Sequence, residues 1–209
     1  MFKSLFSAAV LAIAGIGSAH ADLATVSQWD TTYPNIAGVQ FNTVTNADGF
    51  GSVSLGAHPY KSGVTMANDG VSTFYAPGGV YAADGLGRAN WSFDWVVQLG
   101  ANCLGCTARL MVDNDPSSNV NYVDLSAITT NGPESWNMEM GFMTALVYDF
   151  NPYAPSSTGF RLDLLSAAGA VLASSAITVN VPEPESLALV GVALAGLAVV
   201  RRRKAKQQA

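Results

Sequence analysis

The feature that most constrains this fold is the alternation of apolar and polar side chains over residues 90–99. Large apolar side chains occupy every second position of the run: Trp91, Phe93, Trp95, Val97 and Leu99. The positions between them are mostly polar, among them Asp94 and Gln98. Because successive side chains of a β-strand point to opposite faces, the pattern predicts a strand with one buried face.

Shorter runs with the same period recur along the chain. They lie at residues 108–112, 160–164 and 177–181, with weaker runs at residues 39–44, 50–55 and 71–75. Pairs such as Asp48-Gly49 and Asp84-Gly85, which favour tight turns, separate the runs. We therefore predict a mainly β fold, an antiparallel β-sandwich of the immunoglobulin-like or jelly-roll-like kind.

Residues 134–150 fit more than one structure. Trp136, Met140 and Met143 are spaced to line one face of a helix. A glycine inside the segment and prolines on both sides of it limit any such helix to a few turns.

The charge distribution argues against nucleic acid as a partner of the folded part. The chain has 209 residues, of which 49% are hydrophobic and 12% are charged, so its composition is not that of a disordered protein. Residues 22–181 carry four basic side chains against thirteen acidic ones, a net charge of −9. A body with this charge repels phosphate groups.

The N-terminus has the three parts of a secretory signal peptide. The positive residue Lys3 precedes an apolar stretch at residues 5–17, and Ala19-His20-Ala21 has the small-x-small pattern that signal peptidase cleaves. We predict a signal helix within residues 1–21 and a mature chain that starts at Asp22. The alternative is a buried N-terminal helix, but strand-like composition begins directly after Ala21.

The C-terminus has the pattern of a short transmembrane helix with a stop-transfer signal. Residues 187–200 contain no polar side chain, and the basic run Arg201, Arg202, Arg203 and Lys204 follows directly. Fourteen helical residues span about 21 Å, against about 30 Å for the hydrocarbon core of a bilayer. The basic run favours a cytoplasmic end, which places the body on the other side of the membrane.

The motif Pro182-Glu183-Pro184 stands immediately before that apolar segment. The order of Pro-Glu-Pro, a short apolar helix and an Arg-rich end closely resembles the sorting tail of PEP-CTERM proteins. The resemblance implies a Gram-negative bacterium whose membrane protease, exosortase, recognises the tail near this motif and removes it. The passenger would pass transiently through the inner membrane to the cell surface or the extracellular polymer matrix. The alternative is a Pro-rich linker before a retained anchor.

The chain is therefore predicted to consist of a signal peptide at residues 1–21, a β-sandwich passenger at 22–181 and a sorting tail at 182–209. The passenger also resembles a type found with such tails, on segments 89–95, 112–116, 150–152, 158–164 and 173–181. This second resemblance implies a sandwich of unassigned biochemical role and supplies no catalytic residue.

Cys103 and Cys106 are the two cysteines of the chain. In an exported protein they are expected to form a disulfide. We place them at the tip of a hairpin, between two strand patterns. A redox pair would call for a helix start at the first thiol, and a zinc site would call for two more ligands, so these alternatives fit less well.

Residues 113–124 place oxygen-bearing side chains at the spacing of a calcium loop, with Asp113, Asp115 and Asp124 as candidate ligands. The glycine that such a loop needs at its sixth position is replaced by Ser118. We favour an Asx-rich loop between strands, with no metal or other cofactor, and keep calcium as the alternative.

No catalytic residue is predicted, and we expect the protein not to be an enzyme. His58, the one histidine of the mature chain, is expected in a Gly-rich loop, and no Gly-x-Ser-x-Gly elbow occurs. The tryptophans could form a sugar-stacking platform, but the alternation favours burial of Trp91 and Trp95 in the core.

These observations predict an exported structural or adhesive protein associated with exopolysaccharide or biofilm. Signal peptidase and exosortase are its expected partners during export, and the C-terminal helix is its expected contact with the membrane before processing. A calcium-dependent carbohydrate-binding module is the alternative function, and a secreted hydrolase is the third.

Overall fold

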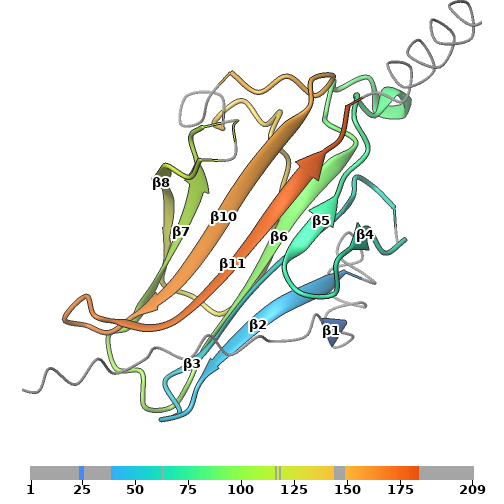
Figure 1. The fold of residues 1–209 in the computed structure, drawn as a ribbon. Coiled ribbons are helices and arrows are strands. Elements are labelled where there is room, and N and C mark those ends of the chain that lie inside the picture. The colour runs from blue at the N-terminus through green and yellow to red at the C-terminus, as the bar shows by residue number, and fades with distance from the viewer. Residues whose placement is uncertain are drawn as a thin grey trace, which may run out of the picture.

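The structure is a computed structural model that describes residues 24–25, 39–62, 64–115, 117, 119–143 and 149–183 (Figure 1). Several predictions from the sequence fall outside these residues. They concern the signal helix with Ala19 and Ala21, the apolar segment at 187–200, Pro184, and the basic run at 201–204. Within the described part of the chain, no helix has the length and apolar character needed to cross a membrane.

Two sheets make up the described fold. The first has five strands in the order β1 (Ala24–Thr25), β2 (Gln40–Asn46), β3 (Gly51–Pro59), β6 (Trp91–Leu99) and β9 (Gly132–Trp136). The second has six strands in the order β4 (Ala67–Asn68), β5 (Thr73–Tyr75), β11 (Val171–Val181), β10 (Ser156–Leu165), β7 (Thr107–Asp113) and β8 (Tyr122–Ile128). A single turn of 3-10 helix, η3 (Ala82–Asp84), lies between β5 and β6.

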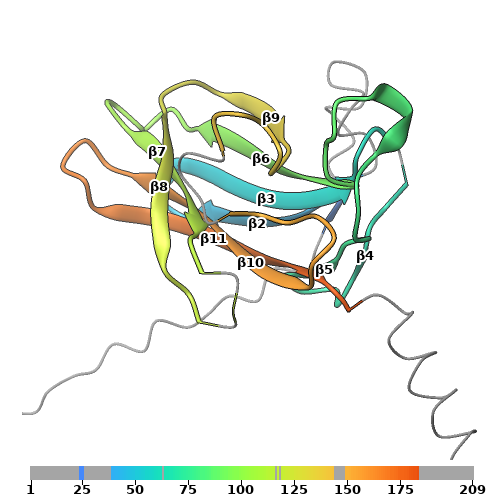
Figure 2. The same cartoon turned by 90° about the horizontal axis from the view of Figure 1, so that it is seen from above.

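The two sheets pack face to face, with β3 and β6 in one layer and β10 and β11 in the other (Figure 2). The alternating apolar residues of β6 face the other layer, as their period predicts. Phe93 stacks on Phe160 of β10 with ring centroids 4.1 Å apart, and both side chains are fully buried. Trp91 meets Phe160 edge to face at 6.3 Å. Aromatic pairs of this kind stabilise a core beyond the contribution of the buried area alone.

The prediction of a purely antiparallel fold is wrong for one strand pair. β5 runs parallel to β11, with Thr73 opposite Thr178 and Tyr75 opposite Asn180, so the six-stranded sheet is mixed. Side-chain alternation reports which face is buried, but it carries no information about strand direction. Direction depends on the connections between strands; here β5 pairs directly with β11, and β4 is added at the sheet edge by its antiparallel pairing with β5. The immunoglobulin-like or jelly-roll-like kind stays a prediction.

Strands β8 and β9 were not predicted as strands. In β8 the register with β7 shifts between Leu110 and Met111, so the inward and outward positions of Tyr122–Ile128 do not alternate regularly. β9 contains Pro133, which is rare inside a sheet, but the strand lies at the sheet edge, where a missing N–H is tolerated. Trp136 therefore belongs to a strand, and residues 137–143 form turns instead of a helix face.

Strand β11 separates two ends of the fold. Its first residues lie beside the β10–β11 turn, and an added Cβ at Gly105 would lie 3.3 Å from the Cβ of Ala167 in that turn. The β6–β7 connection therefore lies at this end. The last residue of β11, Val181, lies at the other end, about 35 Å away for a strand of this length.

Asp69 holds the turn between β4 and β5. Its Oδ1 accepts hydrogen bonds from the backbone N–H groups of Val71, Ser72 and Thr73 at 2.8 to 2.9 Å. Burial alone would raise the pKa of this carboxyl, but hydrogen bonds from the N–H groups of Thr73, Val71 and Ser72 and from the Thr73 side chain together outweigh it and lower the pKa to about 2. The ionised carboxylate is therefore the form that the folded turn prefers.

We predict that Asp69→Ala lowers the free energy of unfolding by about 1 kcal/mol near neutral pH, a value already reduced for solvent screening of this exposed group. A carboxyl whose folded pKa lies below its unfolded value stabilises the fold above about pH 4 and loses that effect as the pH falls toward 2. Urea unfolding near neutral pH and near pH 2 should therefore show that Asp69→Ala lowers the free energy of unfolding less in acid. Asp69→Asn, which keeps an oxygen acceptor, is the control and should cost less. An equal cost of the Ala variant at both pH values would contradict the assignment.

Candidate functional site

The sorting motif begins where the last strand ends. Val181 is 4% exposed and pairs with Ser156 of β10, and the carbonyl of Asn180 accepts the N–H of Ala76 at 2.8 Å. Pro182 follows directly and has no N–H to donate, so the sheet pairing stops there. Pro182 and Glu183 are both exposed. The first two motif residues thus stand outside the fold, with no spacer between them and the final strand.

The loop after β7 is held by aspartate side chains. Asp113 is 2% exposed, and its Oδ1 accepts the N–H groups of Asn121 at 2.7 Å and Asp115 at 3.1 Å. Asp115 in turn accepts the N–H of Ser117 at 2.9 Å. Hydrogen bonds from backbone N–H groups to aspartate side chains are typical of the Asx-rich loop that the sequence predicts here. Among the residues that the structure describes, no group of three or more His, Cys, Asp or Glu side chains is arranged to hold a metal ion.

Cys103 and Cys106 are bonded, with sulfur atoms 2.07 Å apart, as predicted. Their predicted place at a hairpin tip is wrong, because β6 and β7 belong to different sheets. The stapled loop is the crossing from one layer to the other. Two neighbouring strand patterns with a Gly-rich connection look alike in sequence whether the strands pair or change sheets. Leu104, between the two cysteines, is 87% exposed.

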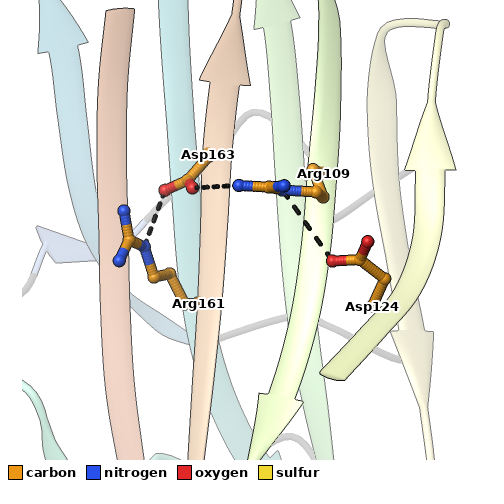
Figure 3. Close-up of polar contacts among 4 residues, drawn as sticks. All are labelled: Arg109, Asp124, Arg161 and Asp163. Atoms are coloured by element: carbon orange, nitrogen blue, oxygen red, sulfur yellow. Dashed lines mark hydrogen bonds and ion pairs between the residues drawn. The ribbon is translucent and has the colours of Figure 1, made fainter. Parts of the chain in front are cut away.

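A row of alternating charges crosses the outer face of the six-stranded sheet (Figure 3). Asp163 of β10 is fully buried, and its carboxylate accepts the Arg161 Nε–H at 2.8 Å and an Arg109 amino group at 3.4 Å. Arg109 also faces Asp124 of β8, with Nε and the nearest oxygen 3.8 Å apart. The calcium candidate Asp124 therefore points across the sheet to an arginine. Two of the four basic residues of the body are paired in this row.

A second polar cluster lies on the outer face of the five-stranded sheet. His58 of β3 and Asp94 of β6 are 2% and 0% exposed, and His58 Nδ1 lies 2.7 Å from Asp94 Oδ2. Burial raises the pKa of the Asp94 carboxyl, against the opposing effects of His58 and of the Ser135 hydroxyl. A cavity of about 170 Å³ opens beside this pair and is lined by His58, Tyr60, Lys61, Ser92, Ser135 and Met140.

The prediction that His58 lies in a Gly-rich loop is wrong. β3 extends four residues beyond the predicted run at 50–55, and His58 pairs directly with Ser92 of β6. Gly56 and Ala57 obscured this strand because neither adds a large apolar side chain to the pattern. The signal that could have revealed the cluster is the polar set of the two strands, with Ser92 and Asp94 on the face opposite the aromatic residues.

The tryptophans do not form a surface platform in the described residues. Trp91 and Trp95 are 1% and 2% exposed and belong to the core between the sheets. Trp136 is half-buried and packs against Trp95 with ring centroids 4.5 Å apart. Trp29 lies outside the described residues.

Comparison with protein families assigns the C-terminal region. Residues 180–204 match the family model described as the PEP-CTERM protein-sorting motif. The chain carries a PEP-CTERM sorting motif. Neither the curated proteins nor the solved structures contain a match to this chain.

The PEP-CTERM motif implies that the protein is exported and is sorted by exosortase. The match starts at Asn180, inside β11, and reaches the basic run. Two residues of the matched region, Asn180 and Val181, are therefore also part of the six-stranded sheet. The predicted motif residues Pro182 and Glu183 are the described part of the tail, and the match covers Pro184 as well.

The buried Asp163 makes the charged row testable. Asp163→Ala should lower the free energy of unfolding by about 2 kcal/mol, because both arginines lose their shared partner. The cost stays below that of a fully buried pair, since Arg109 and Arg161 are 41% and 39% exposed and can be hydrated. The matched control is Asp124→Ala, whose carboxylate is 69% exposed and should change stability by less than about 0.5 kcal/mol. If Asp163→Ala and Asp124→Ala lowered the free energy of unfolding equally in urea, burial of the carboxylate would not determine how much it contributes to stability.

Proposed function

We propose that this protein is exported, cut by exosortase at or near Pro182-Glu183-Pro184, and delivered to the cell surface or the extracellular polymer matrix. There its β-structured body acts as a structural or adhesive component associated with exopolysaccharide, without enzymatic activity. The observation that carries the proposal is the match of residues 180–204 to the sorting motif, which begins at the end of the final strand.

The position of the motif suits removal of the tail. Every strand pairing of the described body is complete at Val181, and Pro182 and Glu183 contribute no strand pairing. A cut after this point takes no residue from the core. The released body therefore keeps the stability of the uncut one, which a protein retained in an extracellular matrix needs.

The two ends of the body support an attached or adhesive role. The tail leaves at the end of β11, and the Cys103–Cys106 loop with exposed Leu104 lies at the opposite end. A disulfide limits the motion of so short a loop. A body held at one end would thus present a stapled loop at the other.

Intact-mass measurement of the protein recovered from its native producer tests the processing. We expect a chain that starts at Asp22 and lacks residues 187–209, because signal peptidase and exosortase remove the two ends. Recovery of a mature chain that keeps its Arg-rich end would contradict the proposal and indicate a retained single-span anchor.

Replacement of Pro182, Glu183 and Pro184 by alanine tests the recognition site. Alanine favours helix, so the extended segment outside the membrane is lost, and we expect uncleaved protein in the membrane fraction. Pro152→Ala, at a half-buried proline outside the motif, is the control and should be cleaved as the wild type is. Normal cleavage of the triple variant would show that exosortase does not need Pro182-Glu183-Pro184 to recognise the tail.

A further inference from the structure

The cavity beside His58 and Asp94 is lined by polar side chains, among them His58, Ser92 and Ser135, together with Met140, on a face that does not contribute to the main core. Ala57 and Phe93, the neighbours of His58 and Asp94 along their strands, face the core, so His58 and Asp94 face the other way. Ser92 stands opposite His58, and Ser135 of β9 stands opposite Asp94. The register of three neighbouring strands therefore gathers these four side chains at one place.

Three of these groups, His58, Ser92 and Asp94, are buried, and Ser135 is half-buried. Ser92 is 2% exposed, and its hydroxyl lies 3.4 Å from the Asn137 amide, a long hydrogen bond. Asp94 engages Nδ1 of His58, so the imidazole ring that lines the cavity retains Nε2 for another partner. Polar groups buried against an apolar filling cost about 1–3 kcal/mol each. A polar occupant of the cavity offsets that cost.

The rim of the cavity adds an aromatic wall and a strained lysine. Lys61 is the one non-glycine residue of the described chain with a positive φ, at 52°. Its ammonium lies 2.9 Å from Asp84 and 5.4 Å from the centre of the Tyr60 ring. Tyr60 meets Tyr81 edge to face at 5.4 Å. Strained backbone persists only where the surrounding contacts hold it in place, and it is concentrated at binding sites.

The charges around the cavity are balanced, which limits the chemistry of the ligand. Lys61 is paired with Asp84, and His58 is paired with Asp94. Neither an anion nor a cation finds an uncompensated partner there. The lining offers both donors and acceptors: two serine hydroxyls, a phenol and an imidazole. A neutral ligand that carries several hydroxyl groups matches this set.

The volume limits the size of the ligand. A cavity of about 170 Å³ holds the volume of about six liquid water molecules. One sugar ring fits such a space, and the remaining rings of a longer chain would lie outside the cavity. A ring would place its hydroxyls on the serines and the imidazole and its apolar C–H face toward Tyr60 and Met140.

We propose that this cavity binds a single neutral sugar residue, either free or at the end of a polysaccharide chain. The site uses no metal ion. The polysaccharide source rests on the proposed function above, whereas the sugar chemistry rests on the cavity itself. Exopolysaccharide would then be held through its chain ends, by a pocket in the outer face of the five-stranded sheet.

The test uses the mature protein recovered from its producer, with saturation-transfer NMR on a panel of glucose, galactose, mannose and N-acetylglucosamine at tens of millimolar. We expect at least one sugar to receive magnetisation from the protein and to shift the His58 imidazole resonances. Ser135→Leu, which fills the cavity from an edge strand, should abolish both signals.

Ser92→Ala should weaken binding about tenfold. Ser54→Ala is the matched control, because this buried serine faces the same side of β3, bonds to Thr43 at 2.8 Å and does not line the cavity; its binding should equal that of the wild type.

Several outcomes would overturn the inference. They are the absence of binding by all four sugars, equal binding by Ser135→Leu and the wild type, and a His58 shift with inorganic phosphate in place of sugar. Thermal unfolding of each variant checks that it is folded. Purified exopolysaccharide of the producer, intact and with its chain ends removed, distinguishes a polymer ligand from a free sugar. If no sugar binds but the tail is removed normally, the sugar site is contradicted and the sorting function is not. If sugar binds but the tail is not removed, the sorting function is contradicted and the sugar site is not.

Discussion

The stacking of β6 on β10 is the contact on which the rest of the structure depends. Phe93 and Phe160 bring the two sheets together, and large apolar side chains of both layers close around them. Each such side chain contributes about 1.5–3 kcal/mol when it leaves water. Because this burial uses one face of each sheet, the register of every strand is set by it, and a slip of one residue would expose the aromatic set.

The same constraint decides what the outer faces can carry. Once the odd-numbered residues of β6 face the core, the even-numbered ones face outward and can be polar. One outer face holds Asp163 between two arginines, a paired arrangement whose charges satisfy one another. The other holds His58 and Asp94 beside a cavity that Ser92 and Ser135 help to line. The ion pairs of the first cluster stabilise the sheet, whereas the second cluster borders the cavity that we propose as a sugar site.

The end of the fold and the start of the sorting tail coincide. Asn180 and Val181 are paired with their neighbours in the sheet, and the next residue is the first proline of the motif. This arrangement lets the body fold to completion and lets the tail be lost without a change in the core. Export, folding and processing are thereby compatible within one short chain.

The sequence by itself determined the β class, the core-facing residues of β6, the bonded cysteines and the sorting motif, because each is a local pattern of a few neighbouring residues. Only the tertiary structure decided the parallel pairing of β5, the change of sheet at Cys103–Cys106, and the meeting of His58 with Asp94 and Ser135. These features depend on which strands become neighbours. Strand order follows from how the whole chain buries its apolar faces, and no single segment contains that information.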